Sequence, residues 1–277
     1  AWANFRVTDN LAIETSQFRQ FNYNAPAVIS AATGETIAPA ATLTGFAAPS
    51  SNVIDNYNTL SSKFGDGAQT EVWQGMDFGV NMRLLNGLTL NGGVSTGTTK
   101  ENDCGILTQL PEMRYNSTIT NNQRPLQFCD RQTPWLTQAK IFGTYTVPKV
   151  DVQVSGTFRN VNGTDINANF GGANAANLAA NSTLVGAPTQ TLALALLEPY
   201  SEYTDRRNEL DFRVGKVVRF GRARSVISWD FFNALNNDAA ITLNQSANPF
   251  TPAANSFRRP QEILNARVMK FTVSFDF

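Results

Sequence analysis

The sequence predicts an all-β fold, an antiparallel up-and-down transmembrane β-barrel to which this chain contributes about eight strands. Segments with alternating apolar and polar residues recur along the chain, as in strands with one apolar face. The spacers between them alternate between about two to four and about 25 to 60 residues, a pattern typical of short periplasmic turns and long extracellular loops. No apolar run approaches the roughly 18 residues of a membrane-spanning helix.

Composition narrows the class of protein. The 277 residues carry 22 basic and 22 acidic side chains, and only 16% of residues are charged. The zero net charge gives no basic surface for nucleic acid, and the charged fraction is low for a soluble protein. We expect a single domain over 1–277, the C-terminal part of a barrel, and we expect any targeting peptide to have been removed or to lie upstream of Ala1.

The first strands are a truncated strand before residues 7–10 and a hairpin over 70–97. Residues 70–85 place on one parity Val72, Met76, Phe78, Val80, Met82 and Leu84. Asn86 and Gly87 form a two-residue turn, and residues 88–97 return. Trp73 falls on the polar parity, which requires a β-bulge in this strand.

A second hairpin follows a long connection. Residues 135–147 and 150–161 alternate with apolar residues on one parity, and Pro148 with Lys149 turns the chain between them. Trp135 is expected at the outer rim. The stretch 163–206 is rich in Asn, Ala and Gly without a sustained period, so it predicts a long loop.

The last strands are expected over 208–220, 225–236 and 267–277. The final segment carries on its apolar parity Met269, Phe271, Val273, Phe275 and Phe277. In water such a strand is an aggregation-prone edge. We therefore expect both of its edges to be paired in a closed barrel and its apolar side to contact lipid.

Cys104 and Cys129, the two cysteines, lie in one long connection. Because the chain has no histidine, a zinc site is not expected, and a disulfide in an oxidising compartment is favoured over two unrelated thiols. The absence of histidine also removes the Ser-His-Asp, Cys-His and HExxH arrangements. We expect no enzyme activity, no metal and no cofactor.

Four stretches carry a family resemblance: "KFGDGAQTEVWQGMDFGVNMR", "LNGGVSTGTTKENDC", "RRNELDFRVGKVVRFGRARSVISWDFFNALNN" and "FRRPQEILNARVMKFTVSFDF". Together they resemble the C-terminal barrel portion of TonB-dependent outer-membrane receptors, in the Oar-like group that carries a carboxypeptidase-regulatory-like domain. The resemblance implies a larger barrel of about 22 strands around a plug, with the plug and the N-terminal regions absent from this chain.

The same resemblance implies partners and roles. The partners are the TonB complex, reached through the absent N-terminal parts, the barrel-assembly machinery, outer-membrane lipid and lipopolysaccharide, and an unknown small solute; no nucleic acid is expected. The cysteine pair matches one in the family's corresponding outer loop. The end of the chain matches the barrel-assembly signal, here Phe271, Val273, Phe275 and Phe277.

Polar-parity side chains are the candidates for contacts in a lumen. They are Asp77, Asn81, Arg83, Lys140, Asp151, Arg159, Asp211, Arg213 and Asp230. Such residues contact a solute or plug, or they pair across strands in a polar lumen, and the second interpretation is favoured. The substrate-binding residues are not identified by the sequence.

The leading hypothesis is a multi-pass transporter and receptor of the bacterial outer membrane that takes up a scarce solute with energy relayed by TonB. The alternative is a small non-transporting barrel with surface loops for adhesion or assembly, because eight strands leave an interior filled by side chains. A soluble β-sandwich is a third hypothesis. It would require Val154, Phe212 and Phe275 to pack inwards against a second layer.

Overall fold

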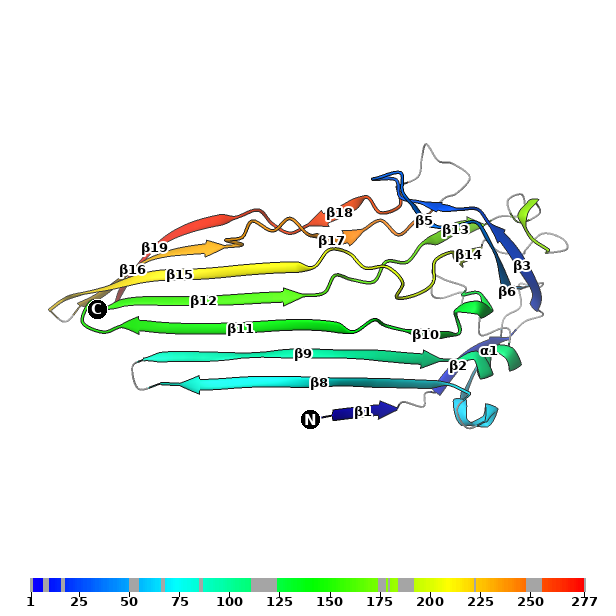
Figure 1. Cartoon of the computed structure of the whole chain (residues 1–277), viewed down its shortest axis with the longest axis horizontal. Coiled ribbons are helices and arrows are strands. Elements are labelled where there is room, and N and C mark those ends of the chain that lie inside the picture. The colour runs from blue at the N-terminus through cyan, green and yellow to red at the C-terminus, as the bar shows by residue number, and fades with distance from the viewer. Residues whose placement is uncertain are drawn as a thin grey trace.

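The computed structural model describes residues 2–6, 10–15, 18–49, 55–65, 68–84, 87–110, 124–173, 178, 180–183, 192–221, 223–247 and 256–276 (Figure 1). Its main feature is one long antiparallel sheet with smaller two-stranded sheets gathered at one end. The prediction of an all-β antiparallel fold is therefore confirmed.

Eight strands follow one another in the main sheet in chain order, as an up-and-down arrangement requires. They are β1 (Trp2–Arg6), β8 (Thr70–Arg83), β9 (Leu88–Asn102), β11 (Leu136–Val147), β12 (Val152–Val161), β15 (Arg207–Phe220), β16 (Ala223–Phe232) and β19 (Val268–Asp276). A ninth, β10 (Asp130–Gln132), extends the pairing along β9. Among the described residues, β1 pairs only with β8 and β19 only with β16, so the sheet is open rather than a closed barrel.

Three tight turns join neighbouring strands at one end of the sheet, on the left in Figure 1. Gly87 has a φ of 85°, and Leu84 N–H donates to the carbonyl of Leu88 at 2.8 Å. In the second turn Lys149 and Asp151 have φ of 69° and 49°, so the strand begins at Val152 and Asp151 lies in the turn. All the long connections leave from the opposite end (Figure 1).

The pairing of β8 with β9 runs without a break from Thr70↔Asn102 to Arg83↔Thr89. The bulge expected at Trp73 is therefore absent. Instead the indole lies over Gly75 and Gly97, which are register partners. A Cβ added to Gly97 would lie 2.8 Å from Trp73 Cε2, so the ring occupies space that only two glycines leave free.

The register divides the sheet into an apolar and a polar face. On the apolar face the exposed side chains are Phe78, Val80, Val94, Ile141, Val154, Val214, Ile227, Trp229, Met269, Phe271, Val273 and Phe275. Val154 is 39% and Phe275 63% exposed, and Phe212 stacks on Phe231 of the same face with ring centroids 4.5 Å apart. The inward packing that a sandwich requires is not found for these residues.

The long connections contain their own strands and short helices, and together they form what we call the cap (residues 10–69, 103–135, 162–206 and 233–267, as far as described). Its elements are β2 (Asn10–Thr15), β3 (Phe18–Ala25), β4 (Val28–Ile29), β5 (Thr36–Ala38), β6 (Ala41–Pro49), β7 (Asp55–Leu60), η1 (Ser61–Phe64), α1 (Cys104–Gln109), η3 (Leu126–Phe128), β13 (Asn169–Ala173), β14 (Leu192–Ala195), β17 (Ala240–Leu243) and β18 (Pro260–Ile263). Within the described part of the chain, no helix has the length and apolarity needed to cross a membrane.

The cap has a hydrophobic core of its own. Phe21 stacks on Phe46 with centroids 5.5 Å apart, and Tyr23 stacks on Phe170 at 6.2 Å. Leu194, Leu196, Leu197 and Phe257 are buried in the same cluster. The stretch 163–206, predicted to be a long loop, is a long connection, but its described residues also supply β13, β14 and part of that core.

Backbone hydrogen bonds tie the four connections of the cap together. Ile106 N–H donates to Ala68 O at 3.3 Å, joining the first connection to the second. Thr183 N–H donates to Asn22 O at 2.9 Å, joining the third to the first. Asn169 N–H donates to Gln245 O at 2.8 Å, and Ala31 N–H donates to Phe257 O at 3.0 Å, so the fourth connection is held by the third and the first. The cap is one interlinked unit.

Candidate functional site

The polar face of the sheet holds eight of the nine residues proposed as lumen contacts. Asp77, Asn81 and Arg83 lie on β8, Lys140 on β11, Arg159 on β12, Asp211 and Arg213 on β15, and Asp230 on β16. Some of them lie directly opposite one another on neighbouring strands: Lys140 is the register partner of Arg159, and Arg213 is the register partner of Asp230. Asp151 lies apart from them, in the turn that precedes β12.

Four of these eight polar side chains have hydrogen-bond or ion-pair partners. Arg213 binds Asp230 in a two-bond arrangement: Nε contacts Oδ1, and Nη2 donates to Oδ2 at 3.1 Å. The Asp230 side chain is 4% exposed, so the guanidinium balances a buried carboxylate. Arg159 Nη2 lies 2.8 Å from Glu209 Oε2, and Asp211 Oδ1 accepts from Asn233 N–H at 2.8 Å.

Lys140, Asp77, Asn81 and Arg83 differ, because they have no side-chain partner among the described residues. Lys140 lies directly opposite Arg159, and two cations in that position repel each other. The pairing of Arg159 with Glu209 leaves the Lys140 charge uncompensated. The free polar groups therefore concentrate on β8 and β11.

These strands border a depression of about 540 Å³. It is open and shallow, and the register partners Gly79 and Gly93 leave no side chains on this face. Around it lie Asp77, Asn91, Gln138, Lys140, Phe142 and Arg159. Both charge signs, two amides and one exposed aromatic ring thus lie around the depression, but its own surface is mostly apolar. This arrangement suits a solute with an apolar or ring-shaped part that contacts the surface and with polar groups that form hydrogen bonds at its margin.

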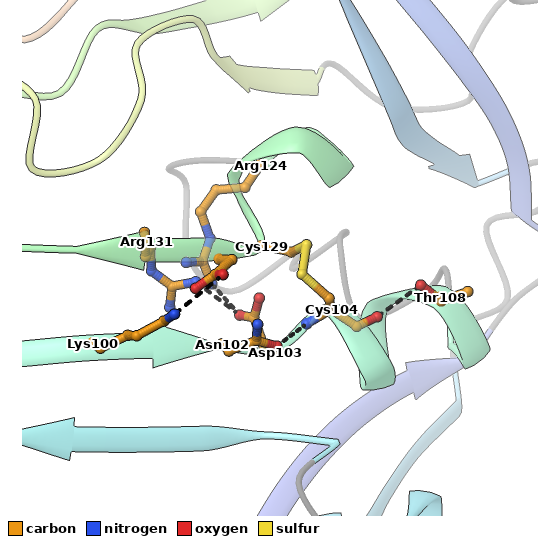
Figure 2. Close-up of a disulfide and its surroundings, with 9 residues drawn as sticks. Lys100, Asn102, Asp103, Cys104, Thr108, Arg124, Cys129 and Arg131 are labelled. Atoms are coloured by element: carbon orange, nitrogen blue, oxygen red, sulfur yellow. Dashed lines mark hydrogen bonds and ion pairs between the residues drawn. A yellow bond between two sulfur atoms is a disulfide. The ribbon is translucent and has the colours of Figure 1, made fainter.

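A second charged site lies where β9 enters the cap (Figure 2). Cys104 and Cys129 form a disulfide with Cα atoms 4.8 Å apart, which fastens α1 to η3. The predicted pairing of the two cysteines is therefore present in the structure. Beside it, Asp103 N–H donates to Cys129 O at 3.0 Å. The disulfide and this backbone hydrogen bond therefore hold the same two segments together.

Two arginines and two carboxylates form a network beside the disulfide. Arg131 Nη1 and Arg124 Nη2 lie 3.1 Å and 3.2 Å from Asp103 Oδ2, as Figure 2 shows, and Arg131 also contacts Glu101. Tyr200, from the third connection, donates through its hydroxyl to Glu101 Oε1 at 2.6 Å. The network therefore joins the second and third connections.

Burial sets the ionisation of this network. Desolvation, together with the hydrogen bond to Glu101, raises the pKa of Tyr200 to about 12. Desolvation and the neighbouring Arg131 lower the pKa of Arg124, opposed by the charges of Asp103 and Glu101. At neutral pH the phenol is a donor, so the network has a structural role rather than that of a proton-transfer site.

The strand proposed as the assembly signal is exposed. Phe271, Val273 and Phe275 lie on the apolar face of β19, and Phe271 meets Trp229 edge-on with centroids 6.3 Å apart. Phe277 lies outside the described residues.

The cap network could not be found by reasoning along the sequence. Tyr200 and Glu101 lie 99 positions apart, and no local pattern relates them. The cysteine pair was the available signal, because a disulfide marks where a long connection is fixed.

The described residues contain no group of three or more cysteine or acidic side chains placed to hold a metal ion. Comparison with protein-family models, curated proteins and solved structures found no match for this chain.

Proposed function

We propose that this chain is part of an active transporter of the bacterial outer membrane, with the apolar face of the sheet in contact with lipid. The observation that carries the proposal is that face: twelve large apolar side chains on seven neighbouring strands remain exposed. A soluble monomer rarely leaves more than a few hundred Å² of contiguous apolar surface in water. Hydrocarbon removes that cost without a second protein layer.

The distribution of the connections supports the same orientation. Short turns at one end and long connections at the other are the pattern of outer-membrane barrels, whose long loops face outwards. The cap would then lie at the cell surface and make the first contacts with a solute. The polar face would line the barrel interior, where the depression beside Lys140 offers hydrogen-bonding groups.

The proposal also accounts for the two free edges of the sheet. The free edges of β1 and β19 would pair with further strands of a larger barrel, and a plug inside it would couple solute binding to TonB. The apolar aromatic strand β19 would be read by the barrel-assembly machinery during insertion. Each of these partners is expected from the family resemblance.

A pair of substitutions on one strand tests the membrane assignment. Ile141→Arg places a charge on the apolar face of β11, which costs about 2 to 4 kcal/mol near the middle of a bilayer. We expect it to reduce the amount of folded protein in outer-membrane fractions. Thr144→Arg, on the polar face of the same strand, should be tolerated. Equal accumulation of both variants, or a wild-type chain that is soluble without detergent, would reject the proposal.

Transport is tested separately. Deleting the gene should abolish high-affinity uptake of one scarce nutrient, and inactivating TonB should have the same effect. Uptake that is independent of TonB would argue against active transport while leaving the membrane assignment intact.

The second candidate is a small non-transporting barrel, favoured by one observation: the sheet has eight strands in sequential order and one free edge at each side. Pairing of β1 with β19 would close it, and its interior would be filled by side chains. Cysteines introduced in pairs, one on each of these two strands, distinguish the candidates, because a disulfide crosslink between β1 and β19 forms only in the closed eight-stranded barrel.

A further inference from the structure

We propose that the depression on the polar face of the sheet binds short peptides in their zwitterionic form, with the ammonium group near Asp77 and the carboxylate near Lys140. Apolar side chains of the peptide contact the surface between these two residues. This inference rests on the proposed transport function and names the class of solute for that same site. The chemical class follows from where the charges lie around the depression.

The residues that carry the proposal share one face of the sheet. Asp77 is the register partner of Ser95, and Ser95 is the register partner of Gln138. Lys140 follows two positions after Gln138 on β11, so its side chain lies on the same face. This is the polar face, assigned above to the barrel interior, where a solute in transit would meet it.

Two opposite charges without a partner lie at the two sides of the depression. Asp77 and Lys140 are exposed, and neither side chain has an ion-pair partner among the described residues. Arg159 also borders the depression, but Glu209 Oε2 lies 2.8 Å from its Nη2 and balances its charge. One free anion and one free cation remain, which match the two charges of a zwitterion.

The spacing of these charges fits a short peptide better than a single amino acid. Because β9 lies between β8 and β11, the register places the Cα atoms of Asp77 and Lys140 about 12 Å apart at ordinary strand spacing. An extended chain of about two to four residues spans at most about 7 to 14 Å. In a single amino acid both charged groups are attached to the same carbon, so it cannot reach both sides.

The surface between the charges is mostly apolar. Gly79 and Gly93 are register partners there, and the ring of Phe142 is 43% exposed beside them. Apolar side chains of a peptide cover this surface, and its removal from water favours binding. The amide groups of Asn91 and Gln138 both donate and accept hydrogen bonds, as the N–H and carbonyl groups of a peptide require.

Two other occupants match the depression less well. The hydroxyl groups of a neutral oligosaccharide carry no charge, so Asp77 and Lys140 would both remain without a counter-ion. A segment inside a folded chain offers peptide groups but no free termini. The two unpaired charges therefore select a free peptide.

The test uses the full-length protein purified in a neutral detergent, with binding measured by calorimetry. The ligands are trileucine, N-acetyltrileucine, trileucine amide, trileucine blocked at both ends, and maltotriose as a neutral sugar. We expect the wild type to bind trileucine most tightly. Each blocked end should weaken binding by about fivefold, the effect of losing one exposed ion pair.

Two variants assign each end of the peptide to one residue. In Asp77→Asn, trileucine should bind about fivefold more weakly, and acetylation should cause no further loss. In Lys140→Gln, conversion of the carboxylate to the amide should be the change without further effect. Lys270→Gln is the matched control, because Lys270 lies opposite Asp230 on the polar face but outside the depression. Its affinities should equal those of the wild type.

A third variant obstructs the apolar surface. A Cβ added to Gly79 meets no atom closer than Gly92 O at 4.0 Å, so a side chain fits there without disturbing the strand pairing. Gly79→Val should therefore keep the thermal midpoint of the wild type. It should weaken the binding of free and blocked peptides alike.

The contrary outcomes are distinct. Equal affinity of the wild type for free and doubly blocked trileucine, or tighter binding of maltotriose, would overturn the proposal in favour of a chain segment or a sugar. An effect of acetylation that persists in Asp77→Asn would overturn it as well. Binding with the expected preferences but without TonB-dependent uptake of the peptide would reject active transport and support the peptide site. TonB-dependent uptake of another nutrient, without peptide binding, would do the reverse.

Discussion

Tyr200 donates its phenolic hydrogen to Glu101 across 99 positions of sequence, with the oxygens 2.6 Å apart. This contact joins the third connection of the cap to β9, the strand that leads into the disulfide-bonded helix α1. Arg131 binds the same glutamate, so the phenol completes a network of charges. The strength of the cap therefore depends on a contact between a residue of a long connection and a strand of the main sheet.

Tyr200→Phe should loosen the cap. A hydrogen bond to a charged group contributes about 1.5 to 3 kcal/mol, and its loss leaves Glu101 less well satisfied. We expect faster amide hydrogen exchange over residues 192–206, measured by mass spectrometry. Tyr203→Phe is the matched control, because the buried Tyr203 hydroxyl has no partner among the described residues. Equal effects of the two substitutions would contradict the assigned role of the network.

Alkaline pH should destabilise the cap in a defined range. Burial raises the pKa of Tyr23 to about 12, and burial with the Glu101 hydrogen bond does the same for Tyr200. Unfolded tyrosine ionises near a pKa of about 10. Because the folded pKa is higher, this contribution to stability is complete below about pH 10 and is lost as the pH rises through about 12. Absorbance at 295 nm should show these tyrosines ionising late, and Tyr200→Phe should remove one of them.

Removing the disulfide should cost stability in the cap. For the loop closed between Cys104 and Cys129, chain entropy predicts about 3 kcal/mol. The double variant Cys104→Ala/Cys129→Ala should unfold in the cap at lower denaturant concentration than the wild type. Reducing the wild type should give the same shift, and reduction should not affect the variant. A variant as stable as the oxidised wild type would show that the network of Arg131 suffices.

Gly97→Ala should destabilise the sheet. The added methyl would meet Trp73 Cε2 and Gln74 O at 2.8 Å, and relieving such overpacking costs about 1 to 3 kcal/mol. Gly79→Ala is the control, because the nearest atom to its added methyl, Gly92 O, lies 4.0 Å away. The thermal midpoint in detergent should fall in the first variant alone. If the thermal midpoints of the two variants are equal, the indole of Trp73 does not pack on Gly97.

The sequence was sufficient to predict the main sheet because its signal is local. Alternation along residues 70–85 and 208–220 reports which side chains share a face, and a turn such as Asn86-Gly87 fixes where the chain reverses. Strand order then follows from short turns. Membrane insertion and barrel closure depend on what surrounds the sheet, so they stay predictions.

The cap was missed because its signal is distributed. Phe21, Phe46, Phe170 and Phe257 come from three connections, and each segment alone is too short or too irregular to show a period. The run "TLALALL" became β14 and buried leucines, although composition around it indicates a loop. Trp73 was misread for a related reason: its packing partner Gly97 lies on the next strand.

The shared core of the cap also sets an order of events during biogenesis. Since its aromatic residues arrive on separate connections, that core cannot assemble until the hairpins carrying them already stand next to one another. In the orientation proposed above, the outward-facing part of the molecule would consequently mature last. An antibody specific for the folded cap would therefore report completed assembly of everything beneath it.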